Sequence, residues 1–356
     1  MQIKKIITGL TILLLLTSSV FAAKAKKSNK DNGKLKVVTT IFPEYDWTRE
    51  ILGDNLKNVE LTLLLGNGVD LHSYQPSIQD IAKISTADIF IYVGGESDGW
   101  VKDALKNATN KNMKAINLLE TLGDKVKAEE IKEGMQAEED EEHEHHHHEG
   151  EHHDDDDDDD HDHEAEGEHH HHHDEDEVEY DEHVWLSLRN AKILSTEIAA
   201  ALCEKDPANA ASYKANLAAY KSKLDALDAK YTTTVKSAPK KTILFGDRFP
   251  FRYLVDDYNL DYYAAFVGCS AETEASFETV IFLSKKVDEL GLNAVLKIES
   301  GDGKIARTIA QNTKNKNAKV LTLDSIQSTT AKQAASGTTY LSIMESNLKV
   351  LEEALK

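Results

Sequence analysis

The stretch LKVVTTIFPEYDWTREILGDNLKNVELTLLL, residues 35–65, determines the fold class that the sequence predicts. Its first part, residues 35–42, is apolar and β-branched and ends at Pro43, which predicts a strand. Residues 45–52 then show helical spacing, and residues 59–65 are again apolar and β-branched. A strand, a helix and a second strand in this order predict a parallel βαβ unit.

The same alternation continues along the chain. In the first half, the pattern predicts a helix at 76–84, a strand at 87–93 and a helix at 189–202. In the second half, it predicts strands at 242–245, 261–267, 294–298 and 320–323, and helices at 277–290, 305–312 and 341–355. We therefore predict an α/β fold with two parallel-sheet lobes, residues 35–204 and 240–356.

A long helix is predicted between the two lobes. Asp206 and Pro207 have the residue types of a helix N-cap and first turn. From there to Tyr231 no Gly or Pro interrupts the chain, so the helix is about 35 Å long at 1.5 Å per residue. We expect residues 207–234 to act as a rigid link between the lobes.

The N-terminus has the features of a secretory signal peptide, residues 1–23. Lys4 and Lys5 precede an apolar run, and small residues ending at Ala23 follow it. The run is shorter than the roughly 20 residues that span a bilayer, so no membrane span is expected after cleavage. No Cys lies near the cleavage region, so a lipid anchor is not expected either. The sequence predicts a periplasmic or secreted protein.

An acidic, histidine-rich tract interrupts the first lobe at residues 137–182. Between Glu138 and Glu182 lie 26 of the 63 acidic residues and 14 of the 16 histidines, but no Lys or Arg. The formal net charge of −22 therefore belongs mainly to this tract, because 37 acids face 41 bases elsewhere. Without clustered Lys and Arg, no nucleic-acid partner is expected.

The composition of the tract gives it several possible roles. So few apolar residues cannot bury enough surface to fold alone, so a disordered loop is predicted. Imidazoles and carboxylates together indicate a collector or sensor of transition metal, most simply zinc. The alternatives are a solvated acidic linker or, for the acidic run 154–160, a preference for calcium.

The two histidines outside the tract lie where polar and apolar patterns meet. His72 follows a predicted strand and precedes a predicted helix, where α/β folds place ligands. His183 stands at the end of the tract, before Trp185, and its acidic neighbours Asp181 and Glu182 are suited to orient an imidazole. Both are predicted metal ligands, against the alternative that each is an ordinary polar residue.

Four segments resemble the zinc/manganese solute-binding subunits of bacterial ABC importers. They are residues 40–46 (TIFPEYD), 72–77 (HSYQPS), 183–191 (HVWLSLRNA) and 206–213 (DPANAASY). The resemblance extends from about residue 35 to 356. It implies two α/β lobes, a metal in the cleft between them, and delivery of this metal to a membrane permease. A long histidine-rich loop is more similar to the zinc members than to the manganese members.

The resemblance also implies the remaining ligands. Gly246 occupies the position of the family's third ligand, which is a departure from the pattern. Asp324 corresponds to the fourth ligand, a carboxylate after a late strand. Zinc usually takes about four donors, so water, Asp247, Cys269 or Glu299 would complete the set. For Cys269, the alternatives are a disulfide with Cys203 or an ordinary buried thiol, since the spacing of the pair gives no geometry.

The function expected from these observations is extracytoplasmic capture of Zn²⁺, with Mn²⁺ as the alternative metal, by a monomer. A secreted histidine-rich metal buffer or adhesin is the alternative function. A metallohydrolase would also use two histidines and an open zinc position. However, the sequence contains no His-Glu-x-x-His pair, G-x-S-x-G or phosphate-binding loop, so no enzyme is expected.

Overall fold

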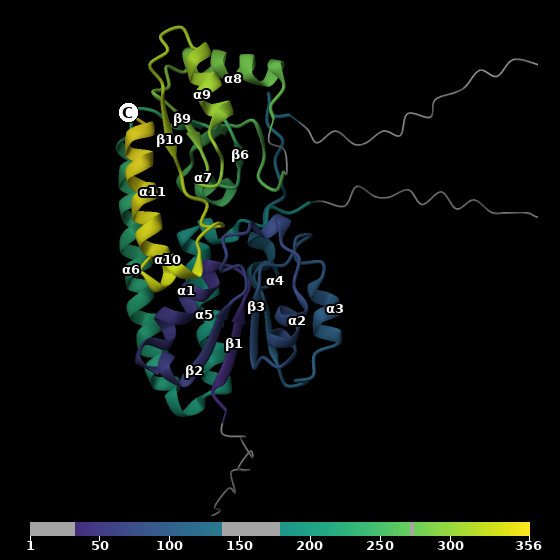
Figure 1. Ribbon diagram of the computed structural model, residues 1–356. Coiled ribbons are helices and arrows are strands. Elements are labelled where there is room, and N and C mark those ends of the chain that lie inside the picture. Colours follow the sequence, from purple (N-terminus) through teal and green to yellow (C-terminus); the bar gives the residue numbers. More distant parts are fainter. Residues whose placement is uncertain (1–32, 137–178, 271–273) are drawn as a thin grey trace, which may run out of the picture. The chain divides into compact units, whose positions relative to one another are not determined.

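The computed structural model describes residues 33–136, 179–270 and 274–356 (Figure 1). The signal sequence and residues 137–178 of the histidine-rich tract therefore lie outside the described residues. The first lobe contains a parallel sheet in the order β2-β1-β3-β4, formed by β1 (Leu35–Thr39), β2 (Val59–Leu63), β3 (Ile89–Tyr92) and β4 (Lys114–Asn117). Its helices are α1 (Phe42–Leu52), α2 (Ile78–Ser85), α3 (Val101–Lys106) and α4 (Leu118–Leu122).

The second lobe is also built on parallel strands. β5 (Thr242–Leu244) pairs with β7 (Asp261–Tyr263), and β9 (Ala294–Lys297) pairs with β10 (Lys319–Thr322). A parallel bridge between Phe245 and Leu296 joins these two pairs. A separate parallel pair consists of β6 (Arg248–Phe249) and β8 (Phe266–Val267). The helices of this lobe are α7 (Arg252–Tyr258), α8 (Phe277–Glu289), α9 (Lys304–Asn312), α10 (Ala331–Ala335) and α11 (Tyr340–Ala354).

The long helix α6 (Ala210–Ser237) contacts elements of both lobes (Figure 1). It packs against α5 (Leu188–Lys205), α1 and α11. Near its start Asn216 donates to the Ile51 carbonyl (2.9 Å), and further along the Tyr231 hydroxyl donates to the Met344 carbonyl (2.6 Å). The prediction of an α/β fold with parallel sheets and a long helix is confirmed.

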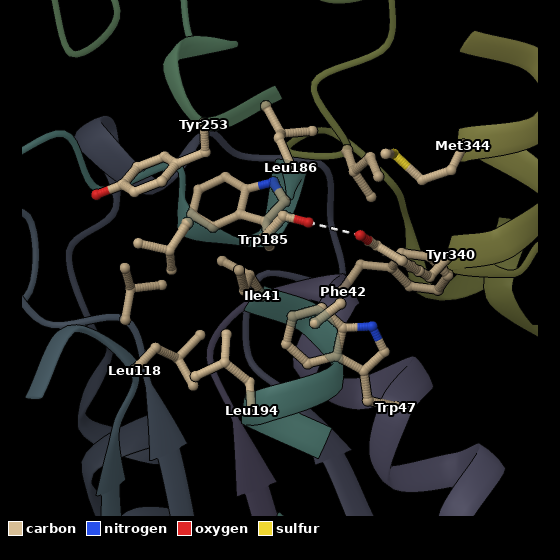
Figure 2. Close-up of a cluster of buried hydrophobic side chains, with 14 of the residues drawn as sticks. Ile41, Phe42, Trp47, Leu118, Trp185, Leu186, Leu194, Tyr253, Tyr340 and Met344 are labelled. Atoms are coloured by element: carbon tan, nitrogen blue, oxygen red, sulfur yellow. Dashed lines mark hydrogen bonds between the residues drawn. The ribbon is translucent and has the colours of Figure 1, made fainter. Parts of the chain in front are cut away.

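One hydrophobic cluster continues from the first lobe into the second (Figure 2). Trp47 of α1 and Tyr340 of α11 pack edge to face with ring centroids 5.3 Å apart. The Tyr340 hydroxyl donates to the Trp185 carbonyl (2.7 Å), and the Trp185 indole donates to the Ser325 carbonyl (2.9 Å). All three aromatic side chains are fully buried, each contributing about 1.5–3 kcal/mol to folding. These contacts fix the position of Trp185 and of the backbone that directly follows His183.

The first helix begins earlier than the sequence predicted. α1 starts at Phe42 rather than at residue 45, because Pro43 fits the first turn of a helix instead of ending the strand. The buried Glu44 carboxylate accepts from the backbone N–H groups of Thr40 (2.8 Å) and Ile41 (3.3 Å), which fixes this start. Among the described residues, no helix has both the length and the apolar character needed to cross a bilayer.

Candidate metal centre

His72 is held on a short turn after β2. The turn is a 3₁₀ helix, Leu71–Ser73, and Asp70 caps it by accepting from the His72 backbone N–H (3.1 Å). In the side chain, Nδ1 lies 2.8 Å from the Ser97 hydroxyl and 3.5 Å from Glu182 Oε2. These contacts aim the opposite ring nitrogen, Nε2, away from the first lobe's polar groups and toward His183.

His183 is fully buried just before a second 3₁₀ turn, Val184–Leu186. Its backbone N–H donates to Asp181 Oδ1 (2.8 Å), and its ring Nδ1 lies 3.1 Å from the same oxygen. The adjacent acids thus orient imidazoles as the sequence predicted, although Glu182 faces His72 rather than His183. A carboxylate that fixes the far nitrogen of a histidine is the usual support of a metal ligand.

The two rings face each other through their Nε2 atoms, which are 3.1 Å apart. Asp181 can only accept, so His183 Nδ1 carries a proton that it donates to this carboxylate. For His72, burial, the neighbouring His183 and Arg248 lower the pKa to about 3, so this ring is neutral. The two Nε2 atoms lie at hydrogen-bonding distance, and a metal ion bound by both rings would take the place of the proton between them.

Cys269 brings a sulfur to the same place. One donor atom each from His72, His183 and Cys269 lie within 4.8 Å of one another, and no other such group occurs in the described parts of the chain. Burial and the nearby Glu129 carboxylate raise the pKa of the Cys269 thiol, whose backbone N–H donates to Glu129 (3.0 Å). Without a cation the thiol therefore keeps its proton. Cys203 is a free cysteine as well, so the described thiols form no disulfide.

Gly246 leaves no room for a ligand at the family's third position. A Cβ atom there would lie 2.4 Å from Ala306 Cα in α9, much closer than real Cβ contacts. The neighbouring Asp247 carboxylate accepts from the backbone N–H groups of Arg248 (3.0 Å) and Ile298 (3.2 Å). Asp247 lies outside the three-donor group, and these bonds hold its carboxylate against the backbone of its own loop and of the residue after β9.

The other two predicted carboxylates also lie outside the three-donor group. Glu299 accepts from the Ser325 backbone N–H (2.7 Å) and from the hydroxyls of Ser325 and Ser328 (both 3.0 Å). Asp324 accepts from the backbone N–H of Ile326 (2.8 Å). Burial and the nearby Glu299 raise the pKa of Asp324 to about 7. Their roles as ligands remain predictions.

Sequence analysis missed several polar residues at this centre. Ser97 holds the His72 ring, and Arg248 forms an ion pair with Asp70 from the other lobe. Gln327, only 3% exposed, places its side-chain amide between Asp70 and His183. None of these residues belongs to a recognisable motif, and each acquires its role only through contacts with segments distant in sequence.

A cavity of about 740 Å³ opens beside the three donors. Its lining is acidic and includes Glu179, Tyr180 and Glu182 from the end of the histidine-rich tract. The other lining residues are His72, Gly95, Glu96, Ser97, Glu129 and Cys269. Gly95 is required here, because it has a φ of +80° and a Cβ on it would lie 2.3 Å from Glu182. Carboxylates around such an opening attract divalent cations toward the imidazoles.

Residues 37–354 match the family ZnuA, zinc-uptake complex component A, periplasmic. The chain belongs to this family. The resemblance seen in the sequence is thereby confirmed, and the family consists of extracytoplasmic solute-binding proteins rather than a known class of enzyme.

Relatives and solved structures agree with this membership. The zinc-binding protein AdcA of Streptococcus pyogenes serotype M3 is 29% identical over 96% of this chain, which spans 60% of that relative's length. The high-affinity zinc uptake system protein ZnuA of Bacillus subtilis is 30% identical over 96% of this chain and 94% of its own. The Zn(II)-bound ZnuA-like domain of Streptococcus pneumoniae AdcA is 26% identical with a TM-score of 0.63, covering 91% of this chain and 99% of that one.

Proposed function

We propose that this protein captures Zn²⁺ outside the cytoplasm and delivers it to the permease of an ABC importer. The observation that carries the proposal is the pair of imidazole Nε2 atoms facing each other at 3.1 Å beside a thiol. The names of the relatives support zinc as the cargo, and family membership supports the importer. We propose that it does so as a monomer.

In this proposal His72, His183 and Cys269 bind the ion directly. Zinc takes imidazole nitrogen at about 2.0–2.1 Å and thiolate sulfur at about 2.3 Å, and it displaces the thiol proton when it binds. Two nitrogens and a sulfur suit zinc better than Mn²⁺, which prefers oxygen donors. Asp324, Glu299 and Asp247 stay candidates for the remaining position, as does water.

The acidic cavity provides the route by which the ion enters. Glu129, Glu179 and Glu182 lower the electrostatic potential along its lining, so a dication is concentrated next to His72. Residues 137–178 of the tract directly precede Glu179 in the sequence. We propose that its histidines bind ions weakly and release them into this cavity.

The alternatives make different predictions for metal binding. A histidine-rich buffer or adhesin would hold many ions weakly and would have no tight stoichiometric site. A metallohydrolase would turn over ester or peptide substrates at an open zinc position. The proposed carrier holds one ion tightly and catalyses no reaction.

Cobalt titration of the full mature chain tests the proposal. The tract contains no cysteine, so a thiolate-to-cobalt charge-transfer band reports the cleft alone. We expect one Co²⁺ per chain with this band, displacement by stoichiometric Zn²⁺, loss of the band in Cys269→Ser, and an unchanged band in the matched control Cys203→Ser. Binding of several Co²⁺ ions without any thiolate band would favour the buffer and contradict the cleft site.

A further inference from the structure

The amide of Gln327 is fixed between two groups of the metal centre. One of its terminal atoms lies 2.7 and 3.1 Å from the two carboxylate oxygens of Asp70, and the other lies 2.9 Å from His183 Nε2. A carboxylate only accepts, so the atom facing Asp70 is the amide nitrogen, which donates both hydrogen bonds. The carbonyl oxygen of Gln327 therefore faces His183.

This contact shares the His183 Nε2 atom with the contact between the histidines. In this orientation the Gln327 carbonyl oxygen accepts from His183 Nε2 at 2.9 Å, and His72 Nε2 lies 3.1 Å from the same nitrogen. The Gln327 side chain is buried away from water. An ion bound to His72 and His183 would replace the proton that His183 Nε2 donates, and the oxygen lone pair of Gln327 would then face the ion.

Two of the donor separations fit a single ion. Neighbouring donors of a tetrahedral zinc site are about 3.3 Å apart, given bond lengths near 2.0–2.1 Å. The separations of His183 Nε2 from His72 Nε2 and from the Gln327 oxygen, 3.1 and 2.9 Å, are slightly shorter than this. For these three donors, binding of the ion therefore requires only small shifts of the side chains.

We infer that Gln327 supplies the fourth donor, its amide oxygen, to the ion held by His72, His183 and Cys269, an inference that rests on the proposed function. It places an uncharged oxygen where the family resemblance expects the carboxylate of Asp324. Cys269 is then the only anionic ligand. Such a set disfavours hard cations such as Mn²⁺, Mg²⁺ and Ca²⁺, which bind mainly through oxygen donors.

Asp70 is the positioning residue for this arrangement. It caps the turn that carries His72, accepts hydrogen bonds from the Gln327 amide nitrogen, and forms the ion pair with Arg248. The ion pair offsets the negative charge that Asp70 would otherwise bring near a donor set. One carboxylate thus sets the orientation of a ligand from each lobe.

The test uses the full mature chain and the displacement of Co²⁺ by Zn²⁺, followed by the thiolate band. We expect Gln327→Leu to keep the band but to lower zinc affinity by about 10–100-fold. Losses of this size are typical when a group that supports a metal site is removed. The matched control Gln311→Leu, at an exposed position of α9, should leave the affinity unchanged, and Asp324→Asn tests the alternative oxygen donor. Thermal unfolding of each variant in chelator checks that the metal-free fold is intact.

A paired substitution separates a ligand role from a structural one. Asp70→Asn together with Gln327→Glu exchanges donor and acceptor, so that position 70 donates and position 327 again offers an oxygen to the ion. We expect this pair to recover affinity relative to Gln327→Leu, which restored packing alone would not achieve.

The possible outcomes are distinguishable. Loss of affinity in Asp324→Asn with none in Gln327→Leu would overturn the inference and assign the oxygen to Asp324, while the proposed function would stand. Equal loss of metal-free stability and affinity in Gln327→Leu, without recovery in the paired variant, would also overturn it. Absence of the thiolate band in the unaltered chain would overturn the proposed function and the inference together.

Discussion

Replacing Gly246 by His would install the residue type that the family resemblance expects, yet it should not create a ligand. The Cβ of any side chain there would lie 2.4 Å from Ala306 Cα, 2.6 Å from Ala306 N and 2.9 Å from Ala306 Cβ. Ordinary contacts begin near 3.4 Å, so α9 would have to move by about 1 Å out of a packed core. Overpacking of this kind costs about 1–3 kcal/mol.

We therefore expect Gly246→Ala and Gly246→His to lower the free energy of unfolding of the metal-free protein by at least about 1 kcal/mol. Neither should raise zinc affinity. Urea unfolding in chelator measures the first effect, and zinc displacement of cobalt measures the second. Gly33→Ala is the matched control, because a Cβ at that position meets nothing within 4 Å.

A tenfold gain of zinc affinity in Gly246→His, with stability unchanged, would refute the steric argument. It would mean that the loop after β5 can turn position 246 toward the donors. Destabilisation in Gly246→His but not in Gly246→Ala would also contradict it, because the clash arises at Cβ and both variants share that atom.

Three further predictions concern single side chains. Asp181→Ala should lower zinc affinity by about 10–100-fold in the cobalt displacement assay, because it frees the tautomer and rotation of the His183 ring. Tyr340→Phe should lower the free energy of unfolding in urea by about 1 kcal/mol, through loss of its hydrogen bond to Trp185. Burial raises the pKa of Glu44 from 4.5 to about 8, so the stability it provides is complete below pH 4.5 and is lost as the pH rises toward 8. Glu44→Gln should therefore gain stability relative to the unaltered chain between pH 5 and pH 8, and an unchanged difference would contradict the assignment.

The sequence predicted the features that depend on local pattern. The alternating strands and helices and the long helix follow from the pattern of residues within short stretches of the sequence. The two histidines stand where an apolar run meets a polar one. β4 was missed because Lys114–Asn117 contains a single strongly apolar residue, Ile116. One such residue cannot show the alternation of apolar and polar positions by which a strand is recognised. α3 and α7 were missed for a related reason, since helices of six and seven residues are too short to show a full apolar stripe.

The metal centre was predictable only in part. His72 and His183 each border a recognisable segment, and Cys269 was considered because thiolate binds zinc strongly. Gln327 was not predicted, since its role depends on Asp70, which lies in the other lobe and far away in sequence. No local pattern carries that information.

The cluster shared by Trp47, Trp185 and Tyr340 bears on how long an ion stays bound. Wide opening of the lobes would expose these rings to water and break the hydrogen bond between Tyr340 and Trp185. The donors themselves lie on loops and short turns, which are the segments that open most readily in folded proteins. For the carrier proposed above, we therefore expect local loosening of those loops to set the residence time of the ion, while the buried aromatic cluster stays intact.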